Sequence, residues 1–288
     1  MQAFHADQFV LPLPEGHRFP MGKYERLRAR VVEHLPMLRL GQAQPASDGE
    51  LALAHTPRHV SAVAEGLLCD AEQREIGFPW SARMVERARR SVGATIQAAR
   101  AALLDGDGVA ANLAGGTHHA QADKGSGYCV FNDAAVAARL MQAEWHRRHR
   151  ALLRVAVIDL DVHQGNGAAA IFRDDDTVFT LSMHGARNFP FRKVPSDLDI
   201  ELPDGCTDVP YLDALDAALE TLGVNCRAIC GRAQAVEAGR LHGYSVMLDG
   251  LTAADALRMQ EQGLGAHREL GCGVFVPHKS AAAVGAPH

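Results

Sequence analysis

Apolar residues along this chain recur at helical spacing in some stretches and form short continuous runs in others. The helical spacing predicts helices at Tyr24–Leu35, Pro57–Leu68, Trp80–Leu104, Asn132–Ala143, Ala168–Phe172 and Leu212–Thr221. Continuous apolar and β-branched runs predict strands buried on both faces at Arg154–Leu160 and Val178–Met183. Another short apolar run, Val109–Leu113, precedes a glycine pair, whereas the chain after Cys230 has little strand character. Buried strands that alternate with helices favour an α/β fold with a parallel sheet.

The residues that follow the apolar runs give the first sign of chemistry. In parallel sheets, functional side chains collect beyond the carboxyl ends of the strands. The runs that end at Leu113, Leu160 and Leu181 are each followed within a few residues by His or Asp. This agreement between architecture and residue type indicates an enzyme.

The composition is that of an ordinary soluble globular protein. The 288 residues are 47% hydrophobic and 22% charged, and the net charge of −5 does not favour binding to nucleic acid or membranes. Apolar runs such as Val155–Leu160 are too short to span a bilayer, and Met1–Val10 lacks the features of a secretory signal. We therefore expect a cytoplasmic protein with reduced cysteines. Cys226 and Cys230 stand four apart and could form half of a metal site, but no second pair with zinc-finger spacing follows.

Three candidate ligands stand at the end of the strand predicted at Arg154–Leu160. Residues two apart in an extended chain point the same way, so Asp159, Asp161 and His163 are candidates for one face. A carboxylate and an imidazole suit an open zinc site that keeps positions for water and substrate. Alternatively, the two carboxylates cap the following helix and the imidazole faces solvent. Carboxylates at the end of an apolar strand are costly unless they are paired or metal-bound, which favours the site.

Two adjacent histidines, His118 and His119, lie on a glycine-rich segment after the apolar run Val109–Leu113. Histidine is the side chain best placed to transfer protons near neutral pH, and a neighbouring carboxylate can orient each ring. On their own, such histidines are usually surface or core residues. The metal-type motif at the next strand end favours a catalytic pair instead.

Three motifs together resemble the histone deacetylase family of arginase-like enzymes. They are Gly115–Gln121, Gly125–Asp133 and Asp159–Gly167, and the segments Gly16–Tyr24, His55–Val60 and Ser182–Gly185 also fit. The resemblance runs from Phe4 to Leu222, and the His-Gln-Gly-Asn-Gly form is similar to class IV and bacterial members. It implies a three-layer αβα domain around a central, mainly parallel sheet. Residues 1–222 would form the deacetylase-like catalytic domain.

The resemblance also implies a role for each matching residue. Asp161 and His163 would bind Zn²⁺ or Fe²⁺, and His118 and His119 would be the acid–base pair. Further residues would orient the pair (Asp159, Asn166), line the substrate tunnel (Gly127, Tyr128, and Phe189 or Phe191) and hold a structural K⁺ (Asp159, Asp161, His163, Ser182). Because the amide of Asn166 carries no negative charge, the His119 imidazolium should be less stabilised than in members with Asp there. Cys129 is expected to pack rather than to act as a nucleophile.

The family pattern stops before two further catalytic residues, a second zinc Asp and the Tyr that supports the oxyanion. Tyr244, Asp249 and Asp255 are the nearest substitutes, and their order and spacing disagree with the family. Residues 223–288 are therefore expected to be a divergent or frame-altered remainder of the same domain.

Two functions follow from this pattern. The first is a zinc-dependent hydrolase that removes acetyl or longer acyl groups from lysine, a polyamine or a related amine. The second is an impaired or inactive homologue that lacks the second metal Asp and the oxyanion Tyr. Arginase-type hydrolysis shares the fold but uses a two-metal carboxylate cluster, and the chain has one D-x-D-x-H motif.

Overall fold

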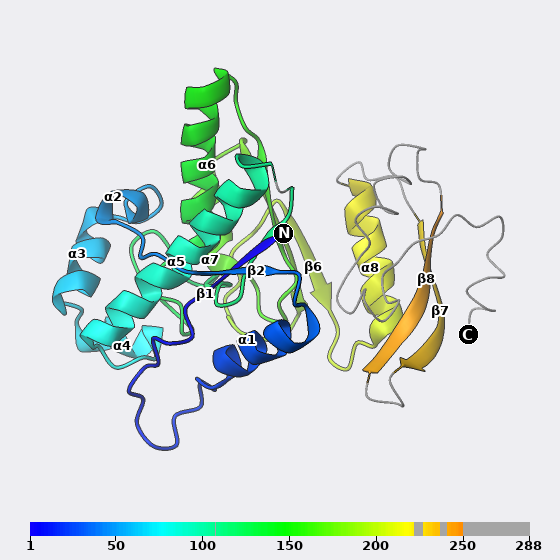
Figure 1. Ribbon diagram of the computed structural model, residues 1–288, viewed down its shortest axis with the longest axis horizontal. Coiled ribbons are helices and arrows are strands. Elements are labelled where there is room, and N and C mark those ends of the chain that lie inside the picture. The colour runs from blue at the N-terminus through cyan, green and yellow to red at the C-terminus, as the bar shows by residue number, and fades with distance from the viewer. Residues whose placement is uncertain (107, 222–226, 237–240, 250–288) are drawn as a thin grey trace. The chain divides into compact units, whose positions relative to one another are not determined.

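The computed structural model describes residues 1–106, 108–221, 227–236 and 241–249. The chain divides into two compact units, Met1–Glu201 (unit 1) and Leu202–His288 (unit 2). The first is an α/β unit that carries every motif of the sequence analysis up to residue 185 (Figure 1).

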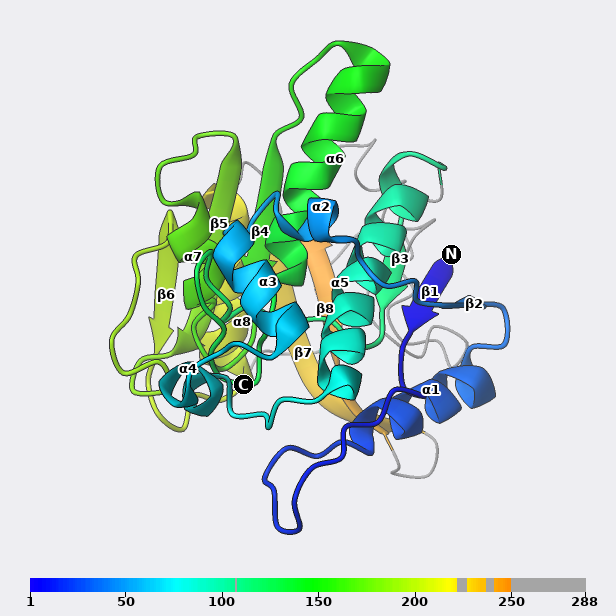
Figure 2. The same cartoon turned by 90° about the vertical axis from the view of Figure 1, so that its left-hand side faces the viewer.

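The first sheet of unit 1 has β1 (Gln2–His5) as its middle strand. Strands β2 (Arg39–Gln42) and β3 (Ala110–Asn112) flank it, and both run parallel to it. Helix α5 (Ala82–Leu103) packs on this sheet, as Figure 2 shows. The approach is close because a Cβ at Gly93 would lie 1.8 Å from the carbonyl oxygen of Gln44. Glycine at this position therefore permits the contact between α5 and the segment after β2.

The second sheet of unit 1 has the order β4-β5-β6. Strands β4 (Val155–Asp159) and β5 (Val178–Gly185) are parallel, with Val155 opposite Val178 and Asp159 opposite Ser182. Helix α7 (Asn166–Phe172) joins them and packs on β5, and β6 covers Leu198–Leu202. This connection places the segment Asp159–Gly167 at the carboxyl end of β4.

The remaining helices of unit 1 are α1 (Lys23–His34), α2 (Asp48–Leu51), α3 (Pro57–Glu65), α4 (Asp70–Ile76) and α6 (Asp133–His149). Helices α5 and α6 pack on one another, and their apolar residues share one core (Figure 2). As predicted, helix α6 begins at a polar cap, because the Asn132 side chain accepts a hydrogen bond from the Ala135 N–H. The cap fixes the chain direction just after the motif that ends at Asp133.

The predicted helices of unit 1 are confirmed, with ends that differ by a few residues, and β5 is buried as expected. The prediction that Arg154–Leu160 is buried on both faces was wrong. Ile158 and Leu160 are 46% and 42% exposed, and Ala156 is also exposed. The exposed residues alternate along β4, so one face of the strand lacks a covering element within the part of the chain that the structure describes, whereas Val155 and Val157 on the other face pack against the core.

Unit 2 contains helix α8 (Asp208–Thr221), as predicted, and two antiparallel strands, β7 (Arg227–Val236) and β8 (Leu241–Asp249). The interpretation that the chain after Cys230 lacks strands was wrong, because pairing between two segments can override weak individual strand propensity. Tyr244 lies within β8, opposite Ala233, and Asp249 ends that strand. Asp255 and Cys226 lie outside the described residues.

The division at Glu201/Leu202 does not coincide with the boundary expected at residue 222. That residues 223–288 complete the catalytic domain stays a prediction. Of the helices among the described residues, none combines the length and the apolar character that crossing a membrane requires.

Candidate functional site

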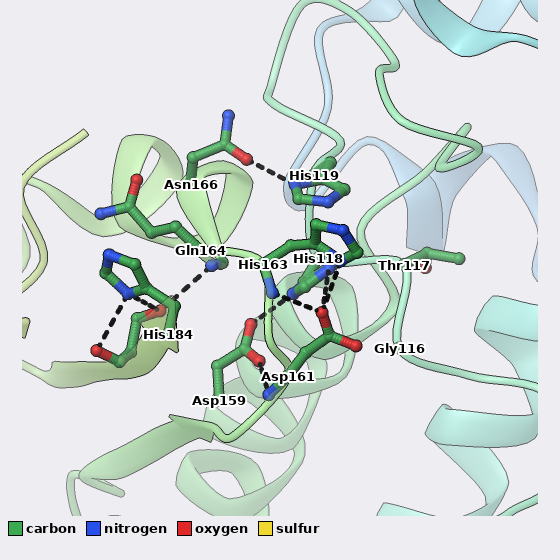
Figure 3. A network of polar contacts seen from close by, with 12 residues as sticks. Gly116, Thr117, His118, His119, Asp159, Asp161, His163, Gln164, Asn166 and His184 are labelled. Carbon is green, nitrogen blue, oxygen red and sulfur yellow. Dashed lines mark hydrogen bonds and ion pairs between the residues drawn. The ribbon is translucent and has the colours of Figure 1, made fainter. Parts of the chain in front are cut away.

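The predicted site residues of unit 1 come together at the carboxyl ends of its strands (Figure 3). The segment Gly115–His119 follows β3, and Asp159–Gly167 follows β4. A cavity of about 560 Å³ opens at this point, and its wall includes both histidines of the pair together with Asp161 and His163. Residues that are far apart in the sequence therefore line one cavity.

His118 is held by the carboxylate of Asp159. Its Nδ1 lies 2.5 Å from Asp159 Oδ2, and the two side chains are 14% and 13% exposed. Burial lowers the pKa of His118, but the hydrogen bond and charge of Asp159, with the charge of Asp161, outweigh burial and raise the pKa above its usual 6.5. His118 is therefore the member of the pair that holds a proton.

His119 is held by the amide of Asn166. Its Nδ1 donates a hydrogen bond of 2.7 Å to Asn166 Oδ1, and both residues are buried. Burial and the charge of His118 lower the pKa of His119 to about 4. The hydrogen bond to Asn166 opposes this lowering without outweighing it, and the difference from members with Asp at this position stays a prediction. With Nδ1 as the donor, Nε2 is left as a proton acceptor.

Asp161 and His163 bond each other, and Asp161 Oδ1 also lies 4.0 Å from His118 Nε2. His163 Nδ1 lies 2.9 Å from Asp161 Oδ1, and the His163 backbone N–H donates to the same oxygen at 2.8 Å. Burial raises the pKa of Asp161, but the His163 N–H and the charge of His118 hold it below its usual value. Neither Asp159 nor Asp161 caps helix α7, because its cap residue is Gly165 and the two carboxylates bond His118, His163 and the Asp161 N–H instead of the first turn of the helix. The helix-capping alternative is therefore wrong.

Few side chains at this site could bind a metal ion. Among the residues that the structure describes, no three His, Cys, Asp or Glu side chains are grouped so that they could hold a metal ion. A catalytic zinc site in proteins has three protein ligands and an open position. Asp161 and His163 would supply two, so the described residues do not by themselves fit a catalytic zinc ion.

Ser182 lies beside this site, on β5. It stands opposite Asp159 in the ladder, and its Oγ accepts a hydrogen bond of 3.2 Å from the Gly165 N–H. Its Oγ also lies 3.0 Å from Nδ1 of the buried His184. The structure thus brings Ser182 next to the segment of Asp159 and Asp161, and the K⁺ site stays a prediction.

Gly127 and Phe189 form a narrow part of the cavity against His119. A Cβ on Gly127, whose φ is +55°, would lie 2.6 Å from His119 Cδ2 and 3.1 Å from Phe189 Cε1. Tyr128 also lines the cavity, whereas Phe191 is 90% exposed and does not. Of the two phenylalanines considered for this wall, Phe189 is therefore the one at the cavity. Cys129 is buried, which raises the pKa of its thiol to about 12, as suits a packing residue.

Asp133 is a positioning residue that sequence reasoning missed. This buried carboxylate accepts hydrogen bonds from the backbone N–H groups of Gly116 and Thr117 and from the hydroxyls of Thr117 and Thr95. It therefore fixes the segment that carries the two histidines. An acidic residue in the first turn of a helix looks like a partner of the helix dipole, so its sequence position gave no signal of this role.

Comparison with known proteins places these motifs in a family. The sequence profile described as histone deacetylase domain matches residues 17–225. An uncharacterized protein of Picosynechococcus sp. is 46% identical over 221 residues, which are 76% of this chain and 71% of that protein. The human polyamine deacetylase HDAC10 is 35% identical over 186 residues, 61% of this chain and 26% of that protein.

Solved structures show the same fold. The crystal structure of an HDAC homolog from Aquifex aeolicus has a TM-score of 0.63 and 26% identity, and the match covers 77% of this chain and 64% of that one. The likeness shows a three-layer α/β fold of the arginase and deacetylase kind, as expected. A second profile, described as Cas6 Crispr, matches residues 201–280, which lie almost entirely within unit 2. This chain thus spans only part of the length of these relatives.

Proposed function

The chain belongs to the histone deacetylase family, and on that basis we propose that its site serves the hydrolysis of an acyl–amine amide bond. The proposed substrate is an acylated lysine in a protein or peptide, or a related acylated amine. The residues assigned to the reaction all belong to unit 1. The observation that carries the proposal is the geometry of the adjacent histidines: His118 Nδ1 lies 2.5 Å from Asp159 Oδ2, and His119 Nδ1 donates a hydrogen bond of 2.7 Å to Asn166 Oδ1. In keeping with this geometry, the pKa of His118 is raised and that of His119 is lowered to about 4. Environments that push two neighbouring pKa values apart are how one site supplies both an acid and a base.

The roles follow from the hydrogen bonds. Asn166 Oδ1 accepts a hydrogen bond from the Nδ1–H of His119, so His119 Nε2 can take a proton from the water that attacks the amide carbon. Asp159 stabilises the imidazolium of His118, which can donate its proton to the leaving amine nitrogen as the C–N bond breaks. The narrow passage at Gly127 and Phe189 would hold the extended chain of the substrate next to the pair.

The residues predicted to bind the metal, Asp161 and His163, support a second candidate function. Because Asp161 and His163 supply two ligands, the described residues do not fit Zn²⁺ or Fe²⁺ unaided, and Tyr244 lies in a strand of unit 2. The alternative is that this chain binds acylated amines and hydrolyses them slowly or not at all. Losing one oxyanion donor alone slows such reactions by about 10²–10³.

Release of free amine from an acetyl-lysine peptide, with and without added Zn²⁺ or Fe²⁺, tests the proposal. We expect turnover that falls about 10²–10⁴-fold in His119→Ala and in His118→Ala, the range for loss of acid–base catalysis. His146→Ala, on the exposed part of α6, is the control and should leave turnover unchanged. Peptide binding by calorimetry without turnover supports the impaired homologue, and absence of both binding and turnover contradicts the proposal.

A further inference from the structure

The cavity that holds the site has an uncompensated positive lining. Four cationic side chains line it: Arg18, Lys23, Arg74 and Arg87. Among the described residues, none of the four pairs with a carboxylate. Seven arginines elsewhere in unit 1 do have such partners: Arg28, Arg30, Arg58, Arg89, Arg90, Arg100 and Arg139. The cavity therefore presents four cations without carboxylate partners to an entering ligand.

Arg87 is the member of this group that most needs a partner. It projects from α5 and is 7% exposed, with its guanidinium carbon 4.5 Å from the centre of the Tyr24 ring. Its Nη2 is buried without any hydrogen-bond acceptor. A buried guanidinium nitrogen without an acceptor is unfavourable, and the contacts of Arg87 with the Tyr24 and Phe19 rings supply no such acceptor for Nη2. The cavity is the direction from which an acceptor can come.

The acidic residues of the cavity do not supply an acceptor for Arg87. The carboxylate of Glu75 is bonded to Lys124 at 2.6 Å, and Asp161 is bonded to His163. The ammonium of Lys23 lies 4.9 Å from the Phe19 ring and also lacks a carboxylate. A cavity with this charge repels a polycation, so a polyamine is disfavoured among the amines that the family resemblance allows.

We propose that this cavity binds substrates that carry a carboxylate, and that Arg87 is the group that receives it. The assignment rests on the proposed function only in taking the ligand to be an acylated amine. A guanidinium fork matches a carboxylate with two parallel hydrogen bonds, and Lys23 adds a second positive charge to the same lining. The carboxylate can be the far end of a dicarboxylic acyl group, such as succinyl, or an acid on the amine side.

Calorimetric titration of the full chain with four small ligands separates these sources. The ligands are capped Nε-succinyl-lysine amide, capped Nε-acetyl-lysine amide, Nα-capped Nε-acetyl-lysine with a free α-carboxylate, and N-acetylputrescine. We expect at least one of the two carboxylate-bearing ligands to bind about 10-fold or more tightly than the capped acetyl amide, as a charge-assisted hydrogen bond allows. The carboxylate-bearing ligand that shows the gain identifies the source, and N-acetylputrescine should bind most weakly.

Variants of α5 assign the preference to Arg87. Arg87→Gln should reduce the ratio of affinities to about one, and Arg87→Lys should restore part of it because the charge returns without the fork. Arg90→Gln is the matched control, since Arg90 is on the same helix and bonds Glu86 and the Ala43 carbonyl. The ratio is measured within each variant, so a partly folded sample does not distort it.

Two results would overturn the proposal: equal affinity for the neutral and carboxylate-bearing ligands, or a preference that persists in Arg87→Gln. If the capped acetyl amide is bound and hydrolysed without any preference, the anion site is wrong and the proposed function stands. If free succinate binds in an Arg87-dependent way and no acyl amide binds at all, the anion site stands and the proposed function is wrong.

Discussion

The two halves of the site are built in different ways. In the acid–base half, His119 is buried and the side chain of His118 is 14% exposed, and each is bonded to a side chain more than forty residues away, Asp159 or Asn166. In the metal half, Asp161 and His163 are 51% and 42% exposed, and they bond each other across two positions of the same loop. Long-range side-chain hydrogen bonds fix the first half, whereas the second is held by this local contact, by one backbone hydrogen bond from Gly185 to Val162 and by the approach of His118 to Asp161 at 4.0 Å.

This difference shows which half of the site the fold restricts to a single arrangement. Buried polar groups must be satisfied by partners, so a network such as that around Gly116, Thr117 and Asp133 permits one arrangement of the histidine segment. Exposed groups exchange their partners for water at little cost. Variants that weaken one half and spare the other should therefore have unequal effects, and the largest effects should fall on the acid–base half.

The largest effect is expected for Asp133→Ala. The change leaves several buried donors of the histidine segment without an acceptor. The free energy of unfolding should therefore fall by about 3 kcal/mol or more. Urea denaturation followed by tryptophan fluorescence reports it, because Trp80 and Trp145 are the only two tryptophans and both lie in unit 1. Asp174→Ala, at an exposed position, should change the value by less than about 0.5 kcal/mol. Equal values for the two variants would contradict the comparison.

Acid should weaken the acid–base half through His55. Its Nδ1 donates to the Gln121 carbonyl, its Nε2 accepts from the Asn132 N–H, and burial with the charge of His59 lowers its pKa from 6.5 to about 4. Above pH 6.5 the folded and unfolded chains are both neutral at this group. Between pH 6.5 and 4, His55 binds a proton in the unfolded chain but stays neutral in the folded chain. The free energy of unfolding therefore falls by roughly 3 kcal/mol towards pH 4.

The measurement is the free energy of unfolding across that pH range. His55→Gln should flatten part of the decline, and the remainder is expected from His119, whose pKa is likewise lowered to about 4, and from His59, whose pKa burial also lowers. His146→Gln, an exposed substitution on α6, should keep the full slope. A wild-type stability that does not change between pH 6.5 and 4 would show that His55 is not held neutral.

The sharpest comparison of the two halves uses the two carboxylates of one strand end. Asp159→Asn removes the charge that stabilises the buried His118 imidazolium and should cost about 2 kcal/mol. Asp161→Asn alters a half-exposed pair and should cost less than about 1 kcal/mol. The same denaturation experiment measures both, and a larger loss in Asp161→Asn would reverse the conclusion about which half is preorganised.

The smallest effect separates backbone strain from side-chain contact. Gly127 and Gly16 both have positive φ, +55° and +77°, but only a Cβ on Gly127 meets other atoms, His119 and Phe189. Gly16→Ala should cost about 1 kcal/mol from the left-handed backbone alone. Gly127→Ala should cost roughly 1 kcal/mol more and should shift the NMR signals of the His119 ring. If the two variants cost the same, the passage is wider than the contacts indicate.

Periodicity predicted helices α1, α3, α5, α6 and α7 of unit 1 and the site segments at strand ends, because these signals are local in the sequence, but it did not predict the short helices α2 and α4. The pairing of His118 with Asp159 and of His119 with Asn166 came from resemblance to a family, since no spacing rule reports contacts across forty residues. Exposure of Ile158 depends on which face of β4 other elements cover, and a single apolar run does not encode that. The unpaired state of Arg87 is likewise a property of the assembled cavity.

The central position of β1 in its sheet also sets the order of events during synthesis. Residues Gln2–His5 gain their second neighbour only when Ala110–Asn112 has been made. At about 5–20 residues per second, the first strand waits roughly 5–20 s on or near the ribosome with one edge unpaired. The histidine segment follows β3 directly and Asp133 comes soon after, so the acid–base pair begins to be placed only when that wait ends.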